Sequence, residues 1–333
     1  MEAKEWALKI RRGDRKAASK LITMIENKEK TARDVLKLLF HGTGTAVSLG
    51  ITGPAGVGKS CLVSCLITAF RKKGKTVGVI AVDPSSPFTG GAFLGDRVRM
   101  MSHIRDEGVY IRSMATRGYL GGLARSTLDT MRVLEAMGKQ MIMVETVGTG
   151  QDEIEVAQIV QTCLLVLTPN MGDDIQAMKS GIMEVGNIIV LNKTDMPGKE
   201  KALLDLETAL RFRSSGKEEW PTPIVCTAAS NGEGIEELVN EIEKHQAYLR
   251  TGEGLSKFAL KRAEKEGAVL LKDEIERAIF HGLKGTGLRR KYLEKIANGE
   301  IDPYSAVEDV LSRFMKDRPQ EPIRSLNQKK ADG

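Results

Sequence analysis

The stretch that decides the fold is AVSLGITGPAGVGKSCLVSCLITAF, residues 46–70. It begins as an apolar strand-like run, turns through glycines at 53, 56 and 58, and continues as a long apolar run with helical character. Residues 53–60 have the spacing Gly, four residues, Gly, Lys, Ser. This is the pattern of a phosphate-binding loop, and a strand before it with a helix after it is the context that the pattern requires.

Each part of this loop has a physical reason. The glycines let backbone N–H groups approach a phosphate with no Cβ in the way. Lys59 is expected to reach the β- and γ-phosphates, and Ser60 to offer its hydroxyl to Mg²⁺. The helix that follows presents its positive end to the anion. The residues expected to line the phosphates are Gly53, Ala55, Gly56, Val57, Gly58, Lys59, Ser60 and Cys61.

Outward from this loop, the chain alternates short apolar runs with helical segments between about residues 44 and 230. Besides the run in the opening stretch, the runs are TVGVIAVD, VYIRSM, QMIMVET, CLLVLT, NIIVLN and PIVCTA. Such alternation is typical of an α/β fold with a mostly parallel central sheet flanked by helices. We expect a P-loop NTPase fold.

The flanks of this region are helical in pattern. Ala18, Leu21, Ile22 and Ile25 form one apolar stripe, and Asp302-Pro303 is typical of a helix start. The predicted divisions are an N-terminal helical segment at 1–40, a nucleotide-binding domain at 41–250, a C-terminal helical arm at 251–315 and a disordered tail at 316–333.

Composition sets broad limits. The chain has 333 residues, 41% hydrophobic and 28% charged, which is ordinary for a globular protein. Its net charge of +6 is spread along the chain, and aromatic residues make up only 5%, so we expect no nucleic-acid partner. The first residues do not resemble a signal peptide and no apolar run reaches transmembrane length, so we expect a cytoplasmic protein without a membrane partner.

A second motif follows the apolar run NIIVL: Asn192-Lys193-Thr194-Asp195. The Asp195 carboxylate has two acceptor oxygens, which match the adjacent N1–H and 2-amino donors of guanine, whereas adenine offers a lone pair at N1. Lys193 can lay its stem on the purine, and Asn192 can tie loops together. A later strand ends at Ala228-Ala229-Ser230, where a backbone N–H can meet guanine O6. The motif therefore indicates GTP or GDP rather than ATP.

A Mg-nucleotide site also needs acids at strand ends. Asp83 and Glu145 each close an apolar run, and Asp96 follows Asp83 in a Pro- and Gly-rich segment. Because Mg²⁺ keeps several waters, we expect Ser60 as a direct ligand and these three acids mostly through water. Gln151 lies in a second expected mobile loop, after Glu145.

Four further stretches carry a resemblance to a known family: VDPSSPFTGGAFLGDRVRM at 82–100, GYLGGLA at 118–124, ETVGTGQDE at 145–153 and GDDIQAMKSGIMEVGNIIVLNKTD at 172–195. Together they resemble the MeaB/ArgK family of P-loop GTPases, over nearly the whole chain. The resemblance implies a GTPase chaperone that gates adenosylcobalamin loading, protection and reactivation of an acyl-CoA mutase such as methylmalonyl-CoA mutase. It also implies a homodimer formed through the C-terminal arm.

The resemblance further implies switch segments at about 146–154 and 170–180, with Lys179 responding to partner and nucleotide. Lys59, Glu145, Gln151 and Lys179 are thus the side chains expected to influence hydrolysis. This chain departs from the family pattern in some places. Cys61 stands where the family has Thr, and Ala228-Ala229 stands where it favours Ser-Ala. We expect altered detail with guanine-nucleotide binding intact.

Three alternatives remain open from the residues. One is a nucleotide-dependent kinase of a transport protein, which the guanine-reading motif disfavours. Another is a metal-inserting GTPase, which would need clustered soft or imidazole ligands, whereas the four histidines are scattered. The last is an assembly factor whose nucleotide does not turn over.

Overall fold

The core of the protein is a seven-stranded, wholly parallel sheet with strand order β3-β2-β4-β1-β5-β6-β7. The computed structural model describes residues 2–83, 100–115, 122–146, 155–169, 183, 185–213, 220–283 and 288–316. The strands are β1 (Val47–Thr52), β2 (Val77–Asp83), β3 (Val109–Ala115), β4 (Met141–Thr146), β5 (Thr162–Leu167), β6 (Ile188–Asn192) and β7 (Ile224–Thr227). Each predicted apolar run is one of these strands, so the predicted α/β fold is confirmed.

The strand order places the phosphate loop at the point where the connections along the chain switch from one side of β1 to the other. β1 pairs with β4 on one side and with β5 on the other, and the register sets Ile51 beside Glu145 and beside Leu164. In open parallel sheets, ligands bind at this kind of switch point, outside the carboxyl ends of the strands. The loop after β1 therefore lies where the fold favours a ligand.

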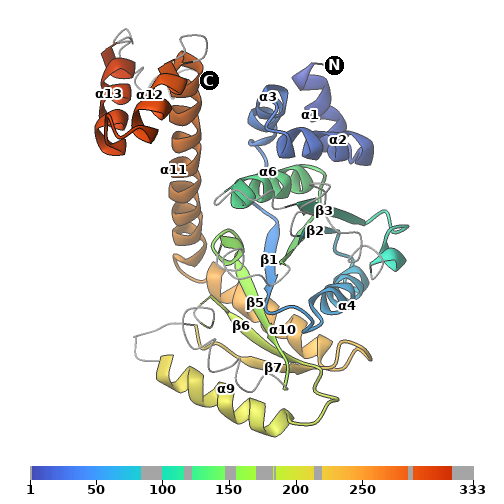
Figure 1. Ribbon diagram of the computed structural model, residues 1–333. Coiled ribbons are helices and arrows are strands. Elements are labelled where there is room, and N and C mark those ends of the chain that lie inside the picture. The colour runs from blue at the N-terminus through green and yellow to red at the C-terminus, as the bar shows by residue number, and fades with distance from the viewer. Residues whose placement is uncertain are drawn as a thin grey trace. The chain divides into compact units, whose positions relative to one another are not determined.

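Helices cover both faces of the sheet because successive residues of a buried strand point to opposite sides. On β5, Leu164 and Val166 pack in the cluster that contains α4 (Lys59–Lys72) and α10 (Ile235–Arg250). Cys163 packs on the opposite face with α6 (Gly122–Ala136), and Leu165 packs there with α9 (Lys199–Arg213). Figure 1 shows this three-layer arrangement around the strands.

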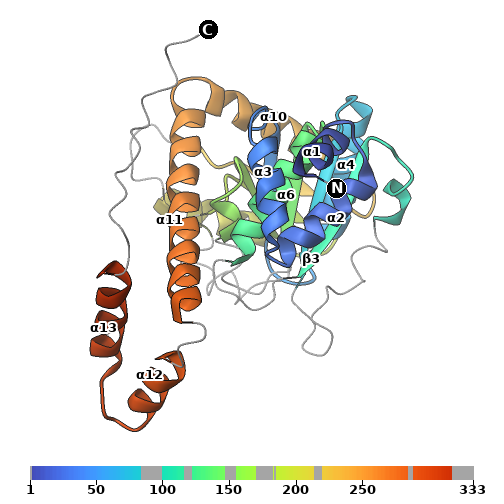
Figure 2. The same ribbon diagram turned by 90° about the horizontal axis from the view of Figure 1, so that it is seen from above.

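Three helices precede β1: α1 (Ala3–Arg11), α2 (Arg15–Glu26) and α3 (Lys30–Leu39). The predicted stripe of α2 is fully confirmed, since its four apolar residues are all buried. These helices share one hydrophobic cluster with α6 and with Tyr110 and Met114 of β3, so they extend the layer on that face (Figure 2).

The chain divides into two compact units, Met1–Ala263 and Glu264–Gly333. The boundary falls within α11 (Gly254–Leu283), which is followed by α12 (Leu288–Ala297) and α13 (Pro303–Lys316). Asp302 caps α13 as predicted, because its carboxylate accepts hydrogen bonds from the backbone N–H groups of Tyr304 and Ser305 at 2.9 and 3.0 Å. The predicted tail lies outside the described residues except for Lys316, which ends α13, and the predicted domain divisions stay predictions.

None of the described helices is long and apolar enough to cross a lipid bilayer.

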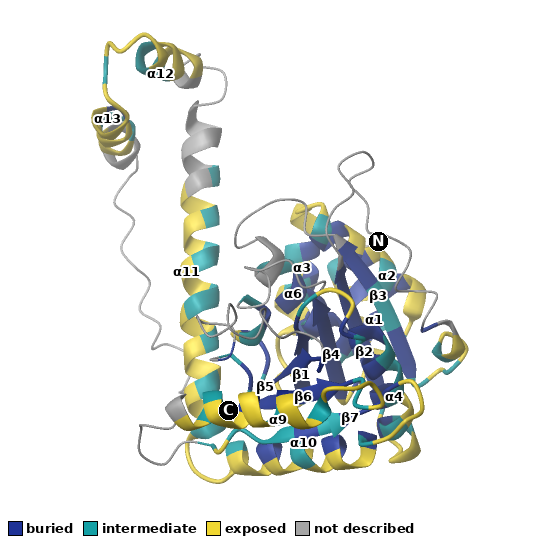
Figure 3. Cartoon of the chain, turned by 60° about the horizontal axis from the view of Figure 1, so that its bottom comes forward, coloured by how far each residue is buried: buried dark blue, intermediate teal, exposed yellow. Residues whose placement is uncertain are grey.

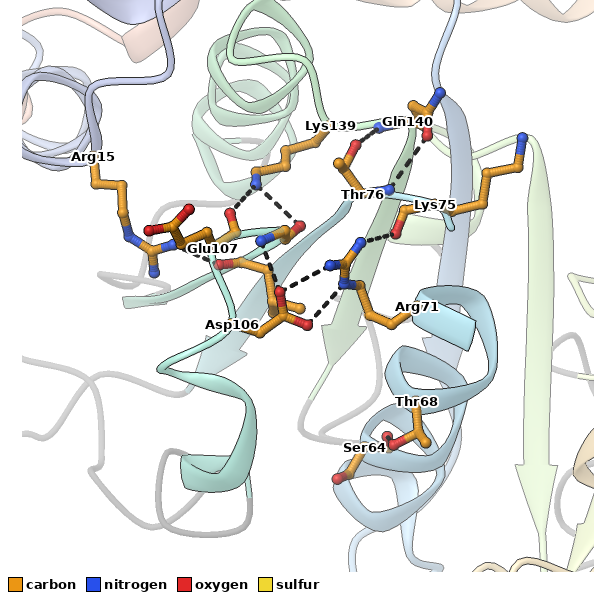
Figure 4. A network of polar contacts seen from close by, with 12 residues as sticks. Arg15, Ser64, Thr68, Arg71, Lys75, Thr76, Asp106, Glu107, Lys139 and Gln140 are labelled. Atoms are coloured by element: carbon orange, nitrogen blue, oxygen red, sulfur yellow. Dashed lines mark hydrogen bonds and ion pairs between the residues drawn. The ribbon is translucent and has the colours of Figure 1, made fainter. Parts of the chain in front are cut away.

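A network of charged side chains lies at the amino ends of β2, β3 and β4 (Figure 4). Asp106 accepts two hydrogen bonds from the guanidinium of Arg71, at 2.8 and 2.9 Å, and a third from the backbone N–H of Gly108. Arg71 is the largest cause of the lowered pKa of the Asp106 carboxyl. Lys139 donates to the carbonyl oxygens of Glu107 and Gly108, at 3.2 and 3.0 Å. These bonds fix the turn that begins β3.

Candidate active site

The phosphate loop follows β1 and takes a conformation that only glycine tolerates. Gly53 has φ of 134°, and a Cβ there would lie 2.1 Å from the carbonyl oxygen of Val166. Gly58 has φ of 96°, and a Cβ there would lie 2.5 Å from Nδ2 of Asn192. The backbone of Val166 and the side chain of Asn192 thus lie so close to these two glycines that any larger residue would clash with them. Ala55 and Gly56, at the tip of the loop, are exposed.

Lys59 begins α4 and is buried, with 6% of its surface exposed. Its ammonium donates to the carbonyl oxygens of Gly53 and Pro54, at 2.5 and 2.7 Å. These contacts hold the positive charge over the loop, beside the positive end of the helix. A buried cation next to backbone N–H groups is suited to a phosphate, because the anion would gain charge-assisted hydrogen bonds there.

Ser60 and Glu145 are brought together by the pairing of β1 with β4. The Ser60 hydroxyl donates to Oε1 of Glu145 at 2.6 Å, and the carboxylate is 4% exposed. Carboxylate and hydroxyl oxygens are the donors that Mg²⁺ prefers, and magnesium commonly takes few direct protein ligands. The donor chemistry of this buried pair therefore fits a Mg²⁺ ion bound with a nucleotide.

The other predicted acids are placed in part. Asp83 ends β2, and its neighbour Val82 lies in register with Thr146 on β4, so its backbone lies near that of Glu145 at the carboxyl edge of the sheet. Its side chain lies outside the described residues, as do Asp96, Gln151 and Lys179. Within the described part of the chain, no three metal-ligating side chains form a cluster.

Asn192 ties the phosphate loop to the end of β7, as the sequence suggested. Its buried side chain donates to the carbonyl oxygen of Val57 at 2.8 Å. Its Oδ1 accepts from the Thr227 hydroxyl at 3.0 Å and from the backbone N–H of Ala229 at 3.1 Å. One amide thereby sets the spacing between the loop for phosphate and the loop expected to meet guanine O6.

The next residues extend from the end of β6 over the phosphate loop. Lys193 has φ of 59° and donates from Nζ to the carbonyl oxygen of Gly56 at 2.8 Å. The backbone N–H and the hydroxyl of Thr194 both bond to the carbonyl oxygen of Thr227, each at 3.1 Å. Asp195 follows and is exposed, so its carboxylate is open to a ligand.

The base loop, residues 228–230, has a compact turn behind it. The backbone N–H groups of Asn231 and Gly232 both bond to the carbonyl oxygen of Ala228, at 3.1 and 3.0 Å. Ala228 and Ala229 are buried, and Ser230 is exposed. The sequence marked Thr227 as the end of a strand but gave it no contact, and it gave Cys65 no role, although both residues bond to this region. The only signal for Cys65 was its position one helical turn after Cys61.

A family model matches the sequence of this chain. The model for "Methylmalonyl Co-A mutase-associated GTPase MeaB" covers residues 18–283. The chain belongs to the MeaB family. A Pyrococcus abyssi protein named "Putative GTPase" is 43% identical over 92% of this MeaB-family chain and 95% of its own. GTPase ArgK of Escherichia coli is 30% identical over 92% and 95%.

A solved structure supports the same assignment. The crystal structure titled "LAO/AO transport system kinase" is 26% identical, covers 94% of this MeaB-family chain and 97% of its own, and superposes with a TM-score of 0.66. Family, relatives and fold agree that the chain is a P-loop GTPase, which hydrolyses GTP and binds guanine nucleotides.

Proposed function

We propose that this GTPase is a chaperone of an adenosylcobalamin-dependent acyl-CoA mutase such as methylmalonyl-CoA mutase. It gates the loading of the cofactor, protects the mutase and assists its reactivation. The family match carries the proposal, because the description of that family names the mutase as the associated protein. The differing contacts of GTP and GDP would bias the loops of the site, and the loops would bias the partner.

Guanine selectivity is assigned to the two loops that Asn192 joins. Asp195 accepts from N1–H and the 2-amino group, Lys193 covers the purine face, and the backbone N–H of Ser230, in the loop of residues 228–230, meets O6. The exposure of Asp195 and the bond between Asn192 and Ala229 support this assignment. A nucleotide without these donors would leave polar groups unpaired at the site, which costs affinity.

Hydrolysis is assigned to in-line attack of water on the γ-phosphate. Mg²⁺, when bound, would neutralise charge on the phosphate oxygens, with Ser60 as a direct ligand and Asp83, Asp96 and Glu145 acting mostly through water. Lys59 and the loop N–H groups would stabilise the charge that develops on the γ-phosphate. Gln151 and Lys179 are assigned to the loops that respond to nucleotide and partner.

A homodimer formed through the C-terminal arm is part of the proposal, and a cytoplasmic location stays a prediction. The helices of the second unit expose large apolar side chains, which favours burial against a second copy. These residues are Leu271, Ile275, Leu293, Tyr304, Val307 and Leu311. Figure 3 shows how much of α11–α13 is exposed, in contrast to the buried strands.

The chaperone role is tested by cofactor transfer. Apo-mutase, adenosylcobalamin and this GTPase are mixed with GTP, with GDP or with a non-hydrolysable GTP analogue, and holo-mutase is followed by cofactor absorbance and mutase turnover. We expect the yield or rate of loading to depend on which nucleotide is present, and the Lys59→Met variant to lose that dependence. Loading that is the same with and without nucleotide would contradict the role.

The kinase alternative is tested in the same reactions. With γ-labelled GTP, a chaperone releases labelled inorganic phosphate, whereas a kinase transfers the label to an acceptor. Stable label on a protein or small molecule would replace the chaperone proposal with the kinase alternative.

A further inference from the structure

Two cysteine side chains of α4 meet at the base loop. Cys61 and Cys65 lie one helical turn apart, so they share a face of the helix. The thiol of Cys61 donates to the carbonyl oxygen of Ala229 at a sulfur–oxygen distance of 3.4 Å, and that of Cys65 donates to the same oxygen at 3.2 Å. Both residues are half-buried free cysteines.

With these bonds, both backbone polar groups of Ala229 are hydrogen-bonded, and we call this set of contacts the clamp. The backbone N–H of Ala229 bonds to Asn192 on one side, at 3.1 Å, and its carbonyl oxygen bonds to the two thiols on the other. Ala229 is 5% exposed, so little water competes for these groups. The loop is thereby held to the same helix that begins with Lys59 and Ser60.

The clamp needs protonated thiols, because a thiolate cannot donate. Burial raises the pKa of the Cys65 thiol, and the neighbouring Cys61 raises it further. Cys65 therefore remains a donor at neutral pH. Each thiol is a weak donor, yet two donors on one carbonyl restrict the loop more than either does alone.

We propose that Cys61 and Cys65 are positioning residues for guanine recognition: by holding the carbonyl oxygen of Ala229, they orient the Ala229–Ser230 peptide so that the backbone N–H of Ser230 meets O6 of the base. The inference rests on the proposed assignment of residues 228–230 to guanine. It predicts that loss of the thiol donors weakens the hydrogen bond to O6 of guanine. The hydrogen bonds from N1–H and the 2-amino group to Asp195 should be unaffected. It also makes nucleotide affinity sensitive to modification of these two thiols.

The test compares GDP with 6-thio-GDP, which keeps N1–H and the 2-amino group but replaces O6 by sulfur. Affinities are measured by competition with a fluorescent GDP for the wild type and for the Cys61→Ala/Cys65→Ala double variant. We expect the double variant to bind GDP about tenfold more weakly, and its preference for GDP over 6-thio-GDP to shrink by a similar factor. A merely structural role would weaken both nucleotides equally and would overturn the proposal.

Cys226→Ala is the matched control. This half-buried cysteine lies on β7 and packs in the cluster of α9, on the opposite face of the sheet from α4. Its removal is expected to leave both affinities unchanged. The unfolding temperature of each variant is recorded so that loss of the fold is recognised.

A reversible version of the test uses the unmutated chain. Methyl methanethiosulfonate transfers a methylthio group to a thiol and releases methanesulfinate, which removes the donor. We expect the treated wild type to lose its preference for GDP over 6-thio-GDP, and dithiothreitol to restore that preference. The affinities of the double variant should not change on treatment.

The outcomes distinguish failure of the proposed guanine site from failure of the proposed role of the thiols. Wild type that does not prefer GDP over ADP would overturn the guanine site itself. Wild type that prefers GDP, with a double variant that discriminates equally well, would overturn only the role of the thiols.

Discussion

Two buried lysines make the same local contacts, one at the carboxyl ends of the strands and the other at their amino ends. Lys59 lies after β1 and Lys139 lies just before β4, with 6% and 7% of their surfaces exposed. Each ammonium donates to the carbonyl oxygens of two successive residues, Gly53 and Pro54 for the first and Glu107 and Gly108 for the second. Hydrogen-bond contacts alone would give the two residues the same role.

The surrounding backbone separates them. Around Lys139 the groups pair with one another: Asp106 accepts from the backbone N–H of Gly108, and Arg71 donates to Asp106. Burial lowers the pKa of Lys139, and the guanidinium groups of Arg15 and Arg71 lower it further. Around Lys59 the glycines take positive φ and a helix begins, an arrangement whose backbone N–H groups favour an anion. A buried lysine thus indicates an anion site only where the backbone also offers donors.

The largest effect is expected at Lys59. The Lys59→Met variant keeps the length of the side chain but loses its charge, so GTP hydrolysis is expected to fall about 1000-fold, because the charge on the γ-phosphate loses its main side-chain partner. Phosphate release at saturating GTP measures it. A variant that retains a tenth of the wild-type rate would place the catalytic charge elsewhere.

The next effect is at the base. In Asp195→Asn the amide presents a donor where the carboxylate presented an acceptor, so GTP affinity is expected to fall roughly 100-fold while xanthosine triphosphate, with an oxygen at position 2, gains affinity. Equilibrium binding of both nucleotides checks this. Asp205→Asn removes the same charge from an exposed position of α9 and is expected to change neither affinity.

A third buried basic side chain extends the comparison. His245 on α10 bonds through Nδ1 to the Thr162 hydroxyl at 2.8 Å and packs against the ring of Trp220. Burial lowers its pKa to about 4. The folded state therefore holds it neutral, and its contribution to stability is complete above the unfolded pKa of about 6.5 and is lost as pH falls toward 4.

At pH 5 this loss is expected to reach about 2 kcal/mol relative to pH 8. Urea unfolding of the wild type and of His245→Gln at both pH values measures it. The variant should lose less stability on acidification than the wild type. Equal losses in the two proteins would show that other groups account for the acid sensitivity.

The smallest effect is expected at Lys139. In Lys139→Met the carbonyl oxygens of Glu107 and Gly108 lose a donor, so the free energy of unfolding is expected to fall by about 1 kcal/mol. GTP hydrolysis should stay within about twofold of the wild type, since no contact of Lys139 reaches the phosphate loop. A large loss of turnover with an unchanged free energy of unfolding would show that Lys139, like Lys59, acts in hydrolysis, and would contradict the structural role.

Much of the fold was predictable because its signals are local. Apolar runs of strand length between helical segments identified all seven strands, and the glycine spacing of residues 53–60 located the loop after β1. The closeness of Ser60 to Glu145 also followed from the sequence, because the carboxyl ends of parallel strands meet at one edge of the sheet.

The missed features depend on contacts between distant segments. Cys65 meets Ala229 across 164 positions of the chain, and Lys139 meets Glu107 across 32. Neither residue is part of a motif, and the sequence around each is typical of an ordinary helix or turn. Such roles become visible only when packing places a donor beside a carbonyl group.

The most direct test of the account is the rate of phosphate release from GTP by the purified chain, alone and with the adenosylcobalamin-dependent acyl-CoA mutase of its host, with ATP in parallel. We predict a slow rate with GTP and none with ATP, and a strong rise in the GTP rate when the mutase is added. A rate that the mutase leaves unchanged, or equal turnover of ATP, would contradict it.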